Sequence, residues 1–265
     1  MLKDLKKSFD TIGYVVIPGL LAAEDAARYR RLINELSGVG DSDYGKKVFE
    51  CADGVSKNPQ FWSLIWNADL LAGLQAILGP SVKYTQHSDL HAHRTGGWHR
   101  DCACRKYNVG PDWDESVVPY QVVRVAIYLQ SFAESGSSLG VVPGSHRFER
   151  HLTSSEWERW ASRYRRGTVW QRIKSKAGLW HPPALPERSM TMWTDPRYDP
   201  ALSEPATPVW IKTEPGDCVI FDQRLYHSAS QITGPKYAVY LSYSPDNIHA
   251  QNHMGYYRHF RKDLQ

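Results

Sequence analysis

The side chains best suited to chemistry in this sequence are two histidines and an aspartate: His99, Asp101 and His227. Residues two apart in an extended strand point to the same face, so His99 and Asp101 can reach one metal ion while Arg100 points away. His227 must then come from a strand that neighbours them in the fold. A His-x-Asp pair with a distant histidine is the ligand set of a facial triad, which holds Fe(II) and leaves coordination positions open. We expect these three residues to be catalytic metal ligands.

The spacing alone is weak evidence, because the chain has 11 histidines and 28 acidic residues. In the alternative interpretation, His99 is a loop histidine with satisfied hydrogen bonds and Asp101 is a turn residue. Two nearby thiols, Cys102 and Cys104, are a second candidate set of metal ligands. Zinc sites usually combine two such pairs or have CxxC spacing, so we interpret these thiols as structural or incidental.

The composition indicates one globular enzyme-sized domain. The chain has 265 residues, of which 42% are hydrophobic and 23% are charged, and both values are ordinary for a globular protein. No apolar run approaches the ~20 residues of a membrane helix. The N-terminus lacks the apolar core of a signal peptide, so we expect a cytoplasmic location and no membrane partner. Four cysteines do not make a disulfide scaffold in a chain of this length.

Basic residues cluster between Arg159 and Lys176, interleaved with tryptophan and tyrosine, in a chain of net charge +4. Such a mixture can bind single-stranded nucleic acid through stacking and phosphate contacts. It is also typical of a solvated helix over an aromatic core, or of a lid that recognises an acidic substrate. We favour the last two interpretations and expect no nucleic-acid partner.

The segments that must position the triad are β-rich from residue 82 onward. A tight turn at 95–97 leads into a ligand-bearing strand at 98–102. The strongest strand is 120–132, with one wholly apolar face. Its other face carries Arg124 and Tyr128, so we expect Arg124 to point into the site. Further strands are expected at 82–91, 209–212, 218–221 and 237–243.

The other elements are expected around this sheet. Residues 9–21 predict a turn, a short strand and a Pro-Gly break. Helices are predicted at 22–36 and 58–78, the second with Pro59 in its first turn, and both should pack against the outside of the sheet. Residues of about 150–208 interrupt the β pattern and predict a helical and looped insertion over the mouth of the site. No second domain is indicated, so 1–265 should form one domain.

Four segments, in their order along the chain, resemble the phytanoyl-CoA hydroxylase-like family of Fe(II)/2-oxoglutarate-dependent dioxygenases. The most specific are the Pro-Gly-Ser-His-Arg turn at 143–147 and the Pro-Gly-Asp-x-x-x-Phe-Asp run at 215–222, which leads to His227. The others are 9–21 and 98–101. The resemblance implies a mainly β fold with flanking helices, a double-stranded β-helix (a cupin-like jelly roll). It also implies that His99, Asp101 and His227 bind iron and that His146 is structural.

The cosubstrate site departs from the family pattern. The family usually carries an arginine after the distal histidine that grips the far carboxylate of 2-oxoglutarate. Here the comparable position is Lys236, which can bind a carboxylate only as a point charge. Arg124 is the other candidate anchor. We also expect Gln86 and Tyr128 at the cosubstrate site, and substrate contacts from Arg94, Trp98, His91 and Trp193.

The resemblance implies that Fe(II), 2-oxoglutarate and O2 together oxidise a small-molecule substrate, with release of succinate and CO2. We expect hydroxylation, or another oxidation, of an unactivated C–H bond in a small metabolite, with acidic metabolites among the candidates. Halogenating relatives have a small residue at the position of Asp101, so its carboxylate favours hydroxylation. The alternatives are a non-catalytic jelly-roll protein that binds a small acidic ligand, and a zinc-dependent protein with the same three ligands.

Overall fold

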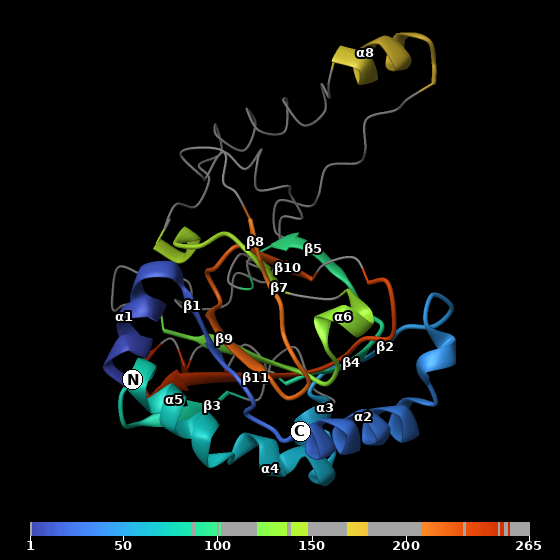
Figure 1. The fold of residues 1–265 in the computed structure, drawn as a ribbon. Helices are drawn as coiled ribbons and strands as arrows, with labels where there is room; N and C mark the ends of the chain where they lie inside the picture. The colour runs from blue at the N-terminus through green and yellow to red at the C-terminus, as the bar shows by residue number, and fades with distance from the viewer. Residues whose placement is uncertain are drawn as a thin grey trace.

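The fold is built from two antiparallel sheets that face each other (Figure 1). The structure is a computed structural model, and it describes residues 2–85, 88–99, 101, 121–136, 139–147, 169–179, 208–229, 232–248, 250–251 and 254. The larger, seven-stranded sheet has the order β1 (Tyr14–Ile17), β9 (Cys218–Asp222), β6 (Val123–Tyr128), β11 (Tyr237–Pro245), β4 (Leu90–Ala92) and β2 (Phe49–Cys51), and β3 (Val82–Tyr84) also pairs with β11. The four-stranded sheet has the order β5 (Gly96–His99), β10 (His227–Ala229), β7 (Leu139–Val141) and β8 (Val209–Ile211). This arrangement is the jelly roll expected from the sequence.

Side chains that alternate along β6 face two different hydrophobic cores. Val123, Val125 and Ile127 face outward into a core shared with the helices, whereas Ala126 and Tyr128 face inward, toward the smaller sheet. The helices in the described ranges are α1 (Leu2–Ile12), α2 (Ala23–Ser37), α3 (Gly54–Lys57), α4 (Trp62–Ile65), α5 (Ala68–Leu78), α6 (Phe132–Ser135) and α8 (Val169–Lys176), with 3-10 turns at Asp41–Asp43, Pro59–Phe61 and Ser145–Arg147. Figure 1 shows α2, α4 and α5 beneath the larger sheet, as predicted for the N-terminal helices.

Four predicted elements differ from the structure. The strand expected at 98–102 after a turn at 95–97 is instead β5, which begins inside the expected turn and ends at His99. The helix expected at 58–78 is divided, because Asn67 caps a new helix by accepting a hydrogen bond from the Leu70 amide. The turn expected before β1 is the end of α1. The strand expected at 82–91 is two strands, β3 and β4, which pair with opposite ends of β11. Of the expected insertion at 150–208, only α8 with the residues that follow it, and residue 208, lie within the described ranges.

In the ranges that the structure describes, no single helix is long and apolar enough to span a membrane. The bent pair Pro59–Ile65 and Ala68–Leu78 passes the same test together by length and composition. Leu64, Leu70 and Leu74 of this pair are buried in the outer core.

Gly216 is a position where the fold requires glycine, in the turn that leads into β9. Its φ is +89°, and a Cβ atom there would collide with the backbone carbonyl oxygen of Leu21. We expect Gly216→Ala to lower the free energy of unfolding by about 2–3 kcal/mol and Tm by roughly 5–10 °C. Thermal unfolding checks this, with Gly40→Ala as the control, because Gly40 has negative φ and open space at its Cβ position. Equal Tm values for the two variants would contradict the assignment.

Candidate metal centre

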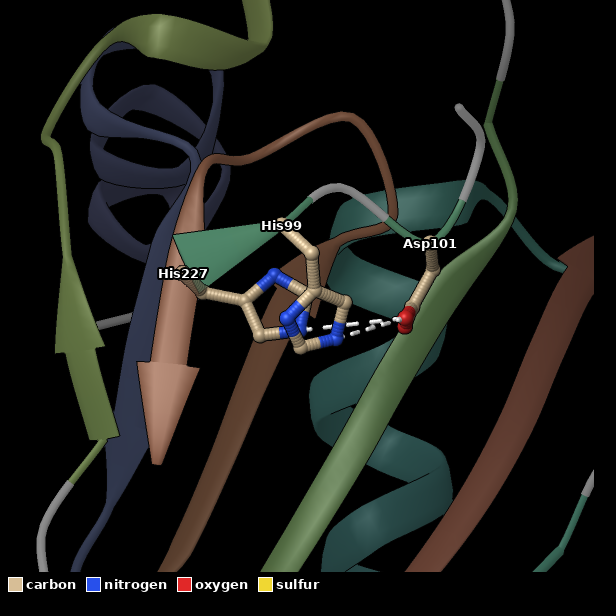
Figure 2. A group of neighbouring side chains, drawn as sticks. All are labelled: His99, Asp101 and His227. Atoms are coloured by element: carbon tan, nitrogen blue, oxygen red, sulfur yellow. Dashed lines mark ion pairs between the residues drawn. The ribbon is translucent and has the colours of Figure 1, made fainter. Parts of the chain in front are cut away.

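His99, Asp101 and His227 meet between the two sheets, and Figure 2 shows their side chains pointing toward one another. The antiparallel pairing of β5 and β10 sets His227 opposite His99. Asp101 Oδ1 lies 3.5 Å from His99 Nε2 and 3.8 Å from His227 Nε2. The strand expected at 98–102 ends at His99, so Asp101 reaches the group from the residues that follow β5. The three candidate ligands are therefore brought together, with one ligand atom of each within 4.8 Å of the others.

Backbone carbonyls orient both imidazole rings. Nδ1 of His99 donates a hydrogen bond of 2.7 Å to the Gly97 carbonyl, and Nδ1 of His227 donates one of 2.8 Å to the Leu225 carbonyl. A carbonyl oxygen only accepts, so each Nδ1 carries a proton, and Nε2 is the ring nitrogen that faces Asp101. Metal-binding histidines are commonly held in this way, with the second nitrogen bonded to a carbonyl or carboxylate.

The charges of the group suit a divalent metal ion. Burial by itself would raise the pKa of Asp101, but His227, the hydrogen bond from His99 and the Arg124 guanidinium together lower it well below its usual range. Burial, and then the neighbouring His99, lower the pKa of His227 to about 4. At neutral pH the group thus has one carboxylate and a neutral His227, the forms in which these side chains bind metals. Ligand atoms about 2.1 Å from a metal lie about 3–3.5 Å from each other, and the distances of 3.5 and 3.8 Å from Asp101 Oδ1 to the two histidines are close to this range.

A cavity of about 250 Å³ opens beside the triad. Besides the three ligands, its described lining includes two acids, three basic side chains, an imidazole and a phenol: Glu50, Asp89, Arg94, Arg124, Lys236, His91 and Tyr240. With Asp101 counted, the described lining holds as many carboxylates as cations. The described lining therefore combines acidic groups that suit a cation with basic groups that suit an anion.

The structure places the predicted cosubstrate and substrate residues differently from one another. Lys236, Arg124, His91 and Arg94 all line the cavity. Trp98 points to the other face of β5, where its ring stacks on Tyr226 at 5.9 Å between centroids and packs against Trp210. Tyr128 is buried in the inner core and is not among the described residues that line the cavity. Gln86 and Trp193 lie outside the described residues.

Lys236 is a buried cation that faces the cavity, with an exposed fraction of 1%. Within the described part of the chain, its Nζ donates one hydrogen bond, to the Arg94 carbonyl at 2.6 Å. Burial, and then the charge of Arg94, lower the pKa of Lys236 to about 8. An anion bound in the cavity would therefore stabilise the charged amine.

The histidines around the triad have different surroundings. His91 is partly buried and lines the cavity beside Tyr240, with 4.9 Å between ring centroids. Its Nε2 has no hydrogen-bond partner among the described residues. His93 turns away through a φ of +57° and bonds the Gly40 carbonyl. His87 lies outside the described residues, and His146 bonds the Asp10 carbonyl, in agreement with a structural role.

Among the lining residues that the sequence did not predict are two acids and a phenol: Glu50, Asp89 and Tyr240. Two of them could have been found from strand alternation, because Asp89 shares a face with His91 and Tyr240 shares a face with Lys236. Glu50 lies in the three-residue strand β2, which is too short to show a pattern.

The comparisons with known proteins agree with this geometry. The model of the family described as phytanoyl-CoA dioxygenase (PhyH) matches residues 9–238. Curated protein sequences contain no significant match. Three similar solved structures each cover more than nine-tenths of this chain.

The first is HygX from Streptomyces hygroscopicus with nickel and 2-oxoglutarate bound, at 16% identity and a TM-score of 0.61, over 92% of this chain and 87% of that one. The second is the epimerase SnoN in complex with Fe3+, alpha ketoglutarate and nogalamycin RO. It has 15% sequence identity and a TM-score of 0.60, and the match covers 92% of this chain and 83% of SnoN. The third is EctD from S. alaskensis with bound Fe. It has 17% sequence identity and a TM-score of 0.56, and the match covers 91% of this chain and 76% of EctD. At these identities the structures establish a shared fold, and the family model establishes the relationship. The chain therefore belongs to the phytanoyl-CoA dioxygenase family, a family of Fe(II)/2-oxoglutarate-dependent oxygenases.

Proposed function

We propose that this oxygenase hydroxylates an unactivated C–H bond of a small metabolite. The observation that carries the proposal is the juxtaposition of two groups in one cavity. One is the His99–Asp101–His227 set, and the other is the buried cation of Lys236. The first suits a divalent metal with open positions, and the second suits the far carboxylate of a chelating dianion.

His99 Nε2, Asp101 Oδ1 and His227 Nε2 would hold Fe(II). When bound, the iron would supply dioxygen activation, with 2-oxoglutarate as the source of two electrons. Overall, one O2, one 2-oxoglutarate and one C–H bond give an alcohol, succinate and CO2, and one oxygen atom goes to each organic product. The protein's own residues position the reactants and neutralise their charges.

Lys236 is the better of the two candidate anchors for 2-oxoglutarate. Its Nζ is committed to one backbone carbonyl among the described residues, so a carboxylate can still bind it. The Arg124 guanidinium, in contrast, already has hydrogen bonds to Asp89 and Ser242. A lysine holds the carboxylate as a point charge, and we expect no bidentate pair.

The substrate would contact the polar residues left over in the cavity. Arg94 and Glu50 form an ion pair at 2.6 Å, and both side chains are more than two-fifths exposed, which places them at the rim. Burial lowers the pKa of His91 to about 3, so this imidazole is neutral and its Nε2 can hydrogen-bond a ligand. A small polar metabolite, with an acidic group favoured by Arg94, fits these contacts. The nogalamycin RO in the SnoN complex is another small molecule bound by this fold.

The proposed function is tested by screening small metabolites for stimulated succinate release under ¹⁸O2. We expect one metabolite class to give succinate and an alcohol in equal amounts, with ¹⁸O in the hydroxyl group. Succinate formation with an unlabelled, desaturated, cyclised or epimerised product would contradict hydroxylation, but it would still agree with a 2-oxoglutarate-dependent oxygenase. No succinate from iron-loaded protein with any substrate would contradict both.

The affinity for 2-oxoglutarate should fall as the pH rises through about 8. The protonated form of Lys236 binds the carboxylate, and the low pKa means that this form is lost within an accessible pH range. Above the pKa we expect KM for 2-oxoglutarate to rise by up to about tenfold per pH unit. Steady-state kinetics over about three pH units around the pKa of Lys236, from roughly pH 6.5 to 9.5, measure this change in KM. Lys236→Arg is the matched control, because a guanidinium stays protonated and its KM should stay flat. A flat KM in the unaltered protein would contradict the assignment.

A further inference from the structure

Arg124 lies against the triad, on the inward face of β6, and its guanidinium contacts three side chains. Nη2 donates to Asp89 Oδ2 and Nη1 donates to Ser242 Oγ, both at 2.9 Å. Nε lies 3.5 Å from Asp101 Oδ2. The side chain is 7% exposed, so these contacts are made away from bulk water and the orientation of the guanidinium is well defined.

The two carboxylate oxygens of Asp101 consequently have different neighbours. Oδ1 faces Nε2 of both triad histidines, while Oδ2 faces Nε of Arg124. A carboxylate that coordinates a metal through both oxygens must turn both of them toward the ion. The attraction of Oδ2 to the guanidinium opposes that rotation.

We propose, on the basis of the proposed function, that Arg124 is a positioning residue that keeps Asp101 a one-oxygen ligand. An octahedral ion with three single-atom ligands has three open positions. A chelating 2-oxo acid needs two of them and dioxygen needs one. A second oxygen from Asp101 would occupy one of these positions and compete with the chelating cosubstrate.

Asp89 connects Arg124 to the backbone of the larger sheet and its neighbouring loop. Besides the guanidinium, the Asp89 carboxylate accepts a hydrogen bond from the amide of Asp53, at 3.2 Å. Arginine can serve Asp89, Ser242 and Asp101 at once because its donors form a rigid planar fork. A lysine ammonium on a flexible stem would not hold all three in this geometry.

The test uses Arg124→Lys and, in case that variant does not fold, Asp89→Asn, which loosens the guanidinium without removing it. Arg30→Lys is the matched control, because Arg30 also bridges two carboxylates, Asp41 and Glu134, outside the cavity. Anaerobic calorimetry on Fe(II)-loaded protein measures the binding of 2-oxoglutarate and of oxalate. Oxalate chelates iron but has no distal carboxylate. The Fe(II) affinity is measured in parallel by competition with a chelator.

We expect Arg124→Lys to weaken the binding of 2-oxoglutarate and of oxalate by the same factor, about tenfold or more. The Fe(II) affinity should change by less than about threefold. Asp89→Asn should act in the same direction, and Arg30→Lys should leave both ligands unchanged. Unchanged binding of both ligands in both variants would overturn the proposal. So would a loss confined to 2-oxoglutarate, which would make Arg124 a carboxylate anchor. Failure of the unaltered protein to bind either ligand with iron would instead contradict the proposed function.

Discussion

Asp101→Ala is expected to abolish succinate formation and to weaken Fe(II) binding by about two to three orders of magnitude. The substitution removes the one carboxylate ligand of the site and leaves two imidazoles. It also removes the anion that lies between the metal position and the Arg124 guanidinium. The metal ion would then face a buried and poorly compensated cation. Chelator competition measures the Fe(II) affinity, and coupled detection of succinate measures turnover.

Two further variants make this result specific. Asp25→Ala removes an exposed aspartate from a surface ion pair with Arg28, and we expect wild-type metal binding and turnover. Asp101→Glu keeps the charge on a longer side chain and should retain part of the metal affinity. An Asp101→Ala protein that is fully loaded with iron and turns over normally would show that Asp101 is not a ligand.

Lys236→Ala should raise KM for 2-oxoglutarate by about 10- to 100-fold, with a smaller effect on kcat. A charge-assisted hydrogen bond is worth about 1.5–3 kcal/mol, and its loss acts on the binding of the cosubstrate. Oxalate binding should change little, because that chelator has no distal group to reach the amine. Initial rates at saturating substrate, with 2-oxoglutarate varied, check the prediction.

The matched control for this variant is Lys83→Ala, which removes an exposed lysine paired with Asp246. We expect its KM to equal that of the unaltered protein. Lys236→Arg keeps a cation at the site and should raise KM less than Lys236→Ala does. If Lys236→Ala had a nearly normal KM, the anchor would have to be another cation of the cavity, such as Arg94 or Arg124.

The triad and the sheet were predictable from sequence because their signals are local. The motif correctly brings His99 and Asp101 together, although Asp101 follows the end of β5 and is not placed by strand alternation. Alternation does correctly turn Arg124 inward and Val125 outward. The resemblance to a known family identified His227 as the third ligand, which spacing alone could not do. The antiparallel register of β5 and β10 agrees with that assignment.

Contacts between distant strands were harder to predict. Glu50 reaches the cavity only because β2 pairs with β4 and sets it opposite His91, and no local pattern encodes that pairing. Alternation implies that Trp98 and His99 point to opposite faces, and Trp98 does pack against Tyr226 and Trp210 instead of making the expected substrate contact. Strand alternation would place His93 on the same face as His91. His93 instead points elsewhere, because its backbone takes a positive φ, which non-glycine residues rarely adopt.

We propose that His99, Asp101 and His227 hold an Fe(II) ion that 2-oxoglutarate chelates beside Lys236. An anaerobic titration of the protein with Fe(II) and then 2-oxoglutarate, followed by visible absorption, tests this most directly. We predict one iron per chain and a metal-to-ligand charge-transfer band that grows only when both components are present. The band should be absent in Asp101→Ala, and its half-saturation should move to higher 2-oxoglutarate in Lys236→Ala. An iron-loaded, unaltered protein that shows no such band at saturating 2-oxoglutarate would contradict the account.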